Sequence, residues 1–173
     1  KIQGSTVENP HSAFTILSPQ LNSPYSSVNK WDWNNSQISY DAIANLDGTL
    51  KGLNQKTAGT MAQLLFSFNA IAEVEKHICK EIPAWDKAGK VKWIRDNFSK
   101  LVIDWYGFGS GVGGNKASIK LWGNTSYFDT TFTHSQSVVT KLTMSSSIKN
   151  AIDDNGFVYL LAYAEPSDGV VSS

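Results

Sequence analysis

The chain has 173 residues, which is enough for one full domain or for two small modules. Its 15 Lys and Arg balance its 15 Asp and Glu, and no long basic block exists, so composition argues against a nucleic-acid-binding surface. Cys79 is the single cysteine, which excludes an internal disulfide. Sparse charge (17%) together with 6 Trp, 6 Tyr and 8 Phe favours a β-rich protein with an uncharged, polar exterior.

The N-terminal region, residues 1–38, lacks a strong hydrophobic period. Pro10, Pro19 and Pro24 interrupt it, and residues 13–17 are long enough for one short strand. We expect this region to be an extended arm that contacts other parts of a larger assembly.

Apolar residues recur at alternating spacings of three and four between Ile43 and Ile78. This spacing is typical of the a and d positions of a coiled coil, and it predicts a helical stalk over residues 39–82. A lone helix cannot bury such a stripe, so the pattern favours a parallel homotrimer. The predicted interface residues are Ile43, Leu46, Leu50, Leu53, Leu64, Ile71, Val74 and Ile78.

The stripe also has weaknesses that leave another interpretation open. Gly48, Gly52 and Gly59 lie inside it, and each costs a helix about 1 kcal/mol relative to Ala. The alternative is two ordinary helices, at about 40–54 and 57–79, folded on each other or on a sheet.

A membrane span is not expected. Residues 57–72 carry no charge, but this stretch is shorter than the about 20 mostly apolar residues that a spanning helix needs.

A short helix is predicted from residue 86 to 97, within a connector of residues 83–99. Beyond it the hydrophobic period changes to two, which predicts strands at 101–106, 117–122, 139–144 and 157–164. Gly-rich and Asn-Gly turns separate these runs. Residues 100–173 are therefore predicted to form an antiparallel β-sandwich, and the chain is α+β; residues 169–173 are expected to form a loop that precedes a further strand.

The sequence carries no recognisable catalytic or metal-binding signature. In the Gly-rich stretch 107–114, the spacing of a phosphate-binding loop is followed by Asn115 instead of Lys. The three histidines are far apart, and no Cys/His spacing suits zinc. A glycosidase needs two facing carboxyl groups; the sequence pairs none of Asp104, Asp129, Asp153 and Glu165. We expect no enzyme activity, no metal and no cofactor.

Of the residue types in this chain, the aromatic ones point most clearly to ligand binding. Flat rings beside Asn and Asp are suited to stack on sugar rings, although core packing is the alternative for at least half of them. Strand alternation places Tyr106 and Trp122 opposite the apolar residues, so both are predicted to be exposed. The predicted ligand-binding residues are Tyr106, Trp122 and Tyr127.

Several motifs resemble a module of virion proteins from tailed phages that infect Bacillus-type hosts. The resemblance carries no catalytic signature, and residues 33–44 are similar in style to the base of phage tail appendages. The motifs lie at residues 88–111, 114–117, 121–122, 133–135, 152–153 and 155–164.

This resemblance implies a tail or head fibre or appendage, often trimeric, with a β-sandwich similar to a sugar-binding jelly roll. It implies a protein made in the bacterial host cytoplasm and displayed on the virion surface, joined to other virion proteins through its N-terminal region and binding host-surface glycans. A carbohydrate-binding module of a secreted enzyme is the alternative. Neither nucleic acid nor a membrane is an expected partner.

Overall fold

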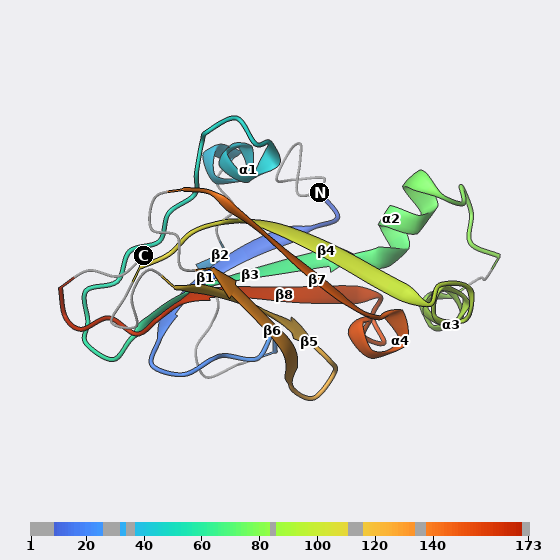
Figure 1. The fold of residues 1–173 in the computed structure, drawn as a ribbon. Helices are drawn as coiled ribbons and strands as arrows, with labels where there is room; N and C mark the ends of the chain where they lie inside the picture. Colours follow the sequence, from blue (N-terminus) through green and yellow to red (C-terminus); the bar gives the residue numbers. More distant parts are fainter. Residues whose placement is uncertain are drawn as a thin grey trace.

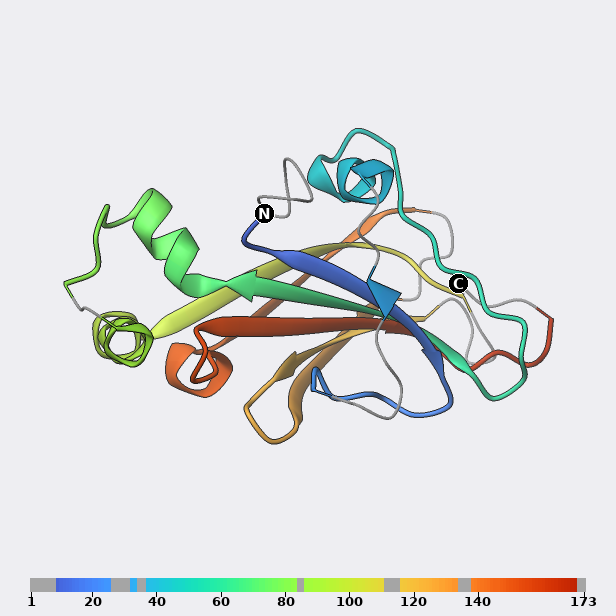
Figure 2. The same ribbon diagram turned by 180° about the vertical axis from the view of Figure 1, so that it is seen from behind.

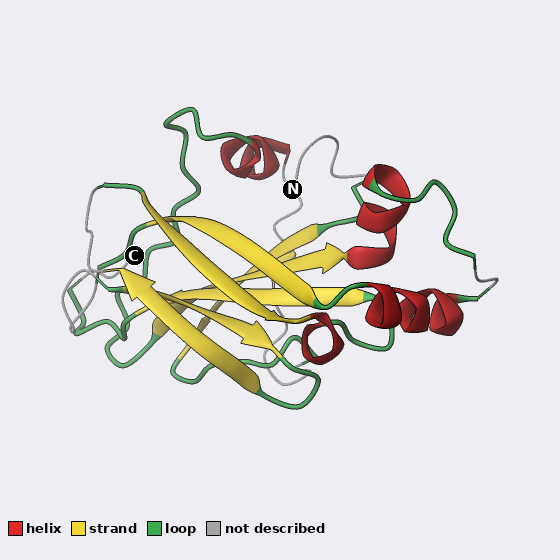
Figure 3. Cartoon of the chain, turned by 45° about the vertical axis from the view of Figure 1, so that its right-hand side comes forward, coloured by secondary structure: helices red, strands yellow, loops and turns green. Residues whose placement is uncertain are grey.

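The computed structural model describes residues 9–25, 32–33, 37–83, 86–110, 116–133 and 138–170. Within this part of the chain the protein is α+β and consists mostly of antiparallel sheet (Figure 1). The helices are short: α1 (Gln37–Ala44), α2 (Ala70–His77), α3 (Lys87–Asn97) and α4 (Ile148–Ala151). Helices α2, α3 and α4 gather at one end of the sheets, whereas α1 lies apart from them (Figures 1 and 3).

The larger sheet has six antiparallel strands in the order β2-β1-β3-β8-β5-β6. Its strands are β1 (Ser12–Ser18), β2 (Asp32–Trp33), β3 (Met61–Asn69), β5 (Ala117–Trp122), β6 (Tyr127–Thr133) and β8 (Phe157–Ala164). A second sheet pairs β4 (Lys100–Gly107) with β7 (Thr140–Ser147).

The two sheets share one apolar core. Strands β3, β5 and β8 contribute Phe66, Ile119 and Leu160, and strand β7 contributes Leu142 and Met144. Burying one such side chain stabilises a fold by about 1.5–3 kcal/mol. Because side chains alternate along a strand, the neighbours of these residues lie on the outer faces of the sheets, where the candidate site is found.

Most of the predicted β-strands are confirmed. The runs at 13–17, 101–106, 117–122 and 157–164 lie in β1, β4, β5 and β8, and the run at 139–144 overlaps β7 from residue 140 on. Helix α3 is confirmed as well, and its N-cap Asp86 accepts a hydrogen bond from the Gly89 N–H, 2.7 Å away.

The coiled-coil stalk is a wrong prediction, because residues 39–82 do not form one helix. Residues 61–69 are the central strand β3, which pairs with β1 on one side and β8 on the other. Gly48 and Gly59 have φ angles of +89° and +76°, which a continuing helix does not allow. A strand buried on both faces carries a nearly continuous apolar run, and such a run also contains residues at heptad spacing.

The predicted interface residues are accordingly dispersed. Leu64 lies in β3 opposite Thr15 and Ala162. Val74 is buried in α2, whereas Leu46 is 70% exposed. Leu50 and Ile78 are also exposed, and Ile43, Leu53 and Ile71 are partly buried.

Two related predictions are corrected by the same contacts. The alternative of helices at 40–54 and 57–79 is wrong, since only 37–44 and 70–77 are helical there. The division into arm, stalk and head does not describe the larger sheet, which combines β1 and β3 with β5, β6 and β8.

Candidate functional site

The candidate site lies on the outer face of the six-stranded sheet, where residues 19–25 cross it. We call these residues the crossing segment; Figure 2 shows it in blue after β1. The fully buried side chain of Gln63 in β3 holds it: Oε1 accepts a hydrogen bond from the Asn22 N–H at 3.1 Å, and Nε2 donates to the Gln20 carbonyl at 2.7 Å. A buried amide that uses both ends in this way fixes the segment in one position.

The crossing segment places Tyr25 against two aromatic side chains of the sheet. The ring centroid of Tyr25 lies 6.2 Å from that of Trp122 and 5.6 Å from that of Tyr159, each at an interplanar angle of 80°. Trp122 in turn meets Tyr127 edge to face at 4.9 Å. Each such contact stabilises the arrangement by about 0.5–1.5 kcal/mol beyond simple burial. We refer to these four residues as the aromatic cluster.

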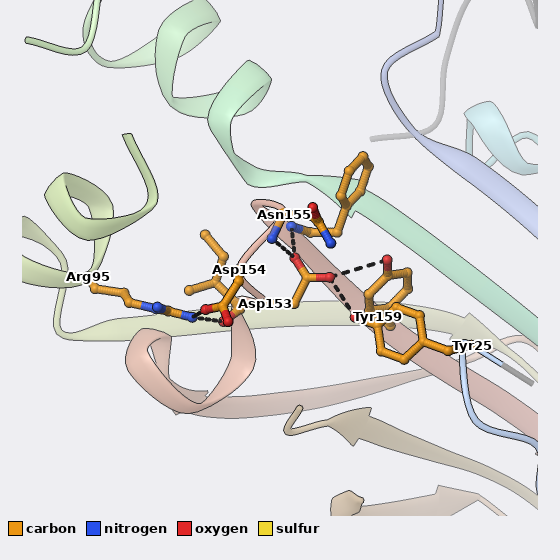
Figure 4. Close-up of polar contacts among 8 residues, drawn as sticks. Tyr25, Arg95, Asp153, Asp154, Asn155 and Tyr159 are labelled. Carbon is orange, nitrogen blue, oxygen red and sulfur yellow. Dashed lines mark hydrogen bonds and ion pairs between the residues drawn. The ribbon is translucent and has the colours of Figure 1, made fainter. Parts of the chain in front are cut away.

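A buried carboxylate connects the aromatic cluster to the turn before β8 (Figure 4). Asp153 is 4% exposed, and its Oδ1 accepts hydrogen bonds from the backbone N–H groups of Asn155 (2.9 Å) and Phe157 (2.8 Å). Its Oδ2 accepts from the Tyr25 hydroxyl at 2.5 Å and, more weakly, from the Tyr159 hydroxyl at 3.5 Å. One side chain therefore determines both the shape of the turn and the position of the Tyr25 ring.

The tyrosines of the cluster remain neutral donors at ordinary pH. Burial, followed by the hydrogen bond to Asp153, raises the pKa of Tyr25 above its usual range. Burial raises the pKa of Tyr159 too, with the Asp153 charge adding to it. Burial alone raises the pKa of Tyr127, whose hydroxyl donates to the Asn22 carbonyl at 2.6 Å.

Helix α3 supports the same turn from its other side. Arg95 Nη2 donates to the Ile152 carbonyl at 2.8 Å and contacts Asp154 Oδ1 at 3.0 Å (Figure 4). Gly156, with φ +84°, completes the turn in a conformation that favours glycine. The site is therefore anchored to a helix, to a sheet and to the crossing segment.

The structure brings together two of the three predicted ligand-binding residues. Trp122 and Tyr127 are neighbours, whereas Tyr106 lies in the second sheet, 5.9 Å from Lys141 Nζ. Trp122 was expected to be exposed, but it is only 7% exposed because Tyr25 packs against it. The exposed ring is Tyr25 itself, at 51%.

The sequence did not predict Tyr25, Asp153 and Tyr159 as residues of the site. Tyr25 contacts Asp153 across 128 positions, and no local pattern reports such a distant pairing. Asp153 was considered only as a carboxylate for which the sequence offers no partner. The available signal was the aromatic residue at every second position of β8, Phe157 and Tyr159, on the side opposite Leu160.

Two of the other candidate carboxylates have partners elsewhere, and the side chain of Asp129 lies outside the described part of the structure. Asp104 pairs with Lys141 at 2.9 Å, and Glu165 pairs with Lys116 at 3.1 Å. In the described ranges, no group of three or more His, Cys, Asp and Glu could hold a metal ion. Across the same residues, no helix is long and apolar enough to cross a membrane. Residues 111–115 of the Gly-rich stretch and His134 lie outside the described part of the chain.

No family model matches the chain, and neither a curated protein nor a solved structure matches it. Function is therefore inferred from the geometry of the site and from the motifs in the sequence.

Proposed function

We propose that the chain is a structural protein of a tailed-phage virion, a fibre or appendage that binds host-surface glycans and catalyses no reaction. The observation that carries the binding proposal is the half-exposed ring of Tyr25, supported edge-on by Trp122 and Tyr159 and held by buried Asp153.

A ring in this position suits a sugar for two reasons. The exposed part of Tyr25 offers an apolar surface for the C–H groups of a sugar ring. The contacts beneath it fix the side chain before any ligand arrives, which lowers the entropic cost of binding.

The virion assignment is supported by the phage-like motifs between residues 88 and 164. We further propose that the two sheets with one shared core are a β-sandwich similar to a jelly roll. The homotrimer and the attachment through the N-terminal region remain predictions. The coiled coil on which the trimer was predicted is not formed, so it no longer supports the trimer.

The glycan proposal is tested by replacing Tyr25. Binding to purified host cell-wall polysaccharide should weaken about 5- to 150-fold in Tyr25→Ala, by analogy with the about 1–3 kcal/mol lost when a base loses a stacking ring. Tyr106→Ala removes a partly exposed tyrosine from the second sheet and serves as the matched control, with unchanged affinity. Equal binding by wild type and Tyr25→Ala, with both folded, would refute the site.

Two further measurements test the remaining parts of the proposal. Antibodies against the chain should label intact virions in electron micrographs; labelling confined to a secreted enzyme would favour the carbohydrate-binding-module alternative. Incubation with the polysaccharide should release no reducing ends. Release that disappears on replacing one Asp or Glu by its amide would show that the protein is an enzyme.

A further inference from the structure

A groove of about 350 Å³ lies next to the aromatic cluster, where α2 and α3 begin and the turn before β8 ends. This volume is within the about 300–1,000 Å³ usual for small-molecule sites. Figure 3 shows the helices and strand ends that meet in this part of the molecule. Its lining includes Asn69, Asp86, Lys87, Lys90, Asn155 and Phe157.

The polar groups of the groove are rigidly placed. Asn69 caps α2, since its Oδ1 accepts from the Ala72 N–H at 3.0 Å, and Asp86 caps α3 in the same way through Gly89. These contacts orient Asn69 Nδ2 as a donor and Asp86 Oδ2 as an acceptor. Asn155 adds an exposed amide on a turn that Asp153 holds. Donors and acceptors around a partly apolar wall are what a hydroxyl-rich ligand requires.

The charges around the groove cancel. Lys87 and Lys90 line it together with Asp86, and Lys90 Nζ pairs with Glu75 at 2.5 Å. Glu75 lies outside the lining, but counted with it the two ammonium groups and the two carboxylates sum to zero charge, so an anion gains no net attraction from these four groups. The balance favours a neutral ligand over a phosphate- or carboxylate-bearing one.

An aromatic surface connects the groove to Tyr25. Phe157 lines the groove and stacks on Tyr159, with centroids 6.2 Å apart at 25°. Tyr159 then meets Tyr25 at 5.6 Å. Asp153 also ties the two ends together, because the same carboxylate binds the Phe157 N–H and the Tyr25 hydroxyl.

We propose that this groove is a second subsite, which binds a neutral sugar unit of the same glycan chain that stacks on Tyr25. The inference rests on the proposed glycan-binding function and adds the ligand class, an uncharged oligosaccharide of more than two units. Phe157 supplies the stacking ring and Asn155 a hydrogen-bonding amide.

The test is isothermal titration calorimetry with neutral and acidic oligosaccharides that have been separated by length. Wild type should bind a neutral hexasaccharide at least about tenfold more tightly than the matching disaccharide, which amounts to about 1.4 kcal/mol. Asn155→Ala and Phe157→Ala should remove that gain and leave disaccharide binding unchanged. Lys92→Ala on the exposed side of α3 is the control and should retain the gain.

Each other outcome has a defined meaning. If Tyr25→Ala weakens binding but wild type shows no gain with length, the groove proposal fails and the proposed function stands. If no saccharide binds wild type, both fail. Preference for acidic chains, with affinity that falls steeply as salt rises from about 0.05 to 0.5 M, would overturn the neutral-ligand assignment.

Discussion

Each of the two sheets has an aspartate and a tyrosine at its outer face, but the aspartate is buried at one face and exposed at the other. Beside the six-stranded sheet, in the turn before β8, Asp153 is buried and its oxygens bind two backbone N–H groups and the Tyr25 hydroxyl. On the two-stranded sheet, exposed Asp104 contacts Lys141 at 2.9 Å and the Thr143 hydroxyl at 2.7 Å. Both faces therefore combine a carboxylate with tyrosine, but the crossing segment covers only the first.

As a result, the ring of Tyr25 is held in one position by its neighbours, whereas the ring of Tyr106 is merely exposed. Tyr106 has only the Lys141 ammonium, 5.9 Å from its ring centroid, as a ring partner among the described residues. Tyr25 has two edge-to-face ring partners and a buried hydrogen bond. Because a fixed side chain loses less entropy on binding, the face with the crossing segment is the better binding surface.

The largest expected effect is that of Asp153→Ala on stability. The substitution leaves two backbone N–H groups and the Tyr25 hydroxyl without their acceptor, and each buried unsatisfied group costs about 1–3 kcal/mol. We expect a loss of about 3–5 kcal/mol in the free energy of unfolding, measured by urea denaturation.

The matched control for Asp153 is Asp104→Ala on the other sheet. Its carboxylate is exposed, so the urea midpoint should stay within experimental error of wild type. Comparable losses in the two variants would show that the two faces do not differ as described.

Acid should destabilise the six-stranded sheet through His11, a residue that is 2% exposed. The Asn69 N–H donates to His11 Nδ1 at 3.0 Å, so the neutral ring carries its proton on Nε2 and donates to Glu73 at 2.7 Å. Burial, which outweighs the Glu73 hydrogen bond, lowers the pKa of His11. The unfolded chain therefore takes up this proton at higher pH than the folded one, and stability falls as pH drops below about 6.5.

Glu73 extends the acid effect to lower pH. Its pKa is lowered in the folded protein, where the His11 hydrogen bond and nearby positive charge outweigh burial, the largest single influence and an opposing one. Its stabilising contribution is lost as pH falls below about 4.5. Urea midpoints from pH 7 to 4 should decline in wild type and in His77→Ala, an exposed histidine 3.6 Å from Glu73. His11→Gln should lose the decline that begins near pH 6.5; an unchanged profile would contradict the assignment.

A smaller effect is expected for Tyr127→Phe. The variant keeps the ring but removes a 2.6 Å hydrogen bond to the Asn22 carbonyl, which costs about 1 kcal/mol. Tyr106→Phe on the second sheet is the paired variant, and it should be neutral because that side chain is partly exposed. The two urea midpoints, measured together, compare the faces with a single hydroxyl removed from each. A neutral Tyr127→Phe would show that the crossing segment is not held at this point.

The sequence predicted the strands with one buried and one exposed face. In β4 the more exposed Val102, Asp104 and Tyr106 alternate with the better buried Leu101 and Ile103, which is the period that was recognised. Strand β8 is also largely buried on both faces, but turn signals bound it in the sequence. Strand β3 was misread because its doubly buried apolar run lies inside a longer stripe at heptad spacing. Gly48 and Gly59 were the local evidence against a long helix, since both adopt positive φ.

The candidate site was only partly predictable for a related reason. Trp122 and Tyr127 were chosen as aromatic residues near a turn, and they meet because β5 pairs with β6 in a hairpin register. Tyr25 joins them through the buried amide of Gln63, a polar residue in the middle of a central strand. A buried polar residue requires partners, but the sequence does not show which distant segment supplies them.

The smallest expected effect is the coupling between Asp104 and Lys141. The hydrogen bond to Asp104 raises the pKa of Lys141, and hydrogen bonds from Thr143 and Lys141 lower that of Asp104. Such a pair stabilises the fold only between the two pKa values, where both groups are charged. Both side chains are exposed, however, so water and salt screen their attraction.

A double-mutant cycle of Asp104→Asn and Lys141→Met, read as urea midpoints at pH 7 and about 0.15 M salt, should give no measurable coupling. A large coupling would mean that the outer face of the second sheet is also fixed by its polar contacts, and Tyr106 would then have to be tested as a binding residue on the same terms as Tyr25.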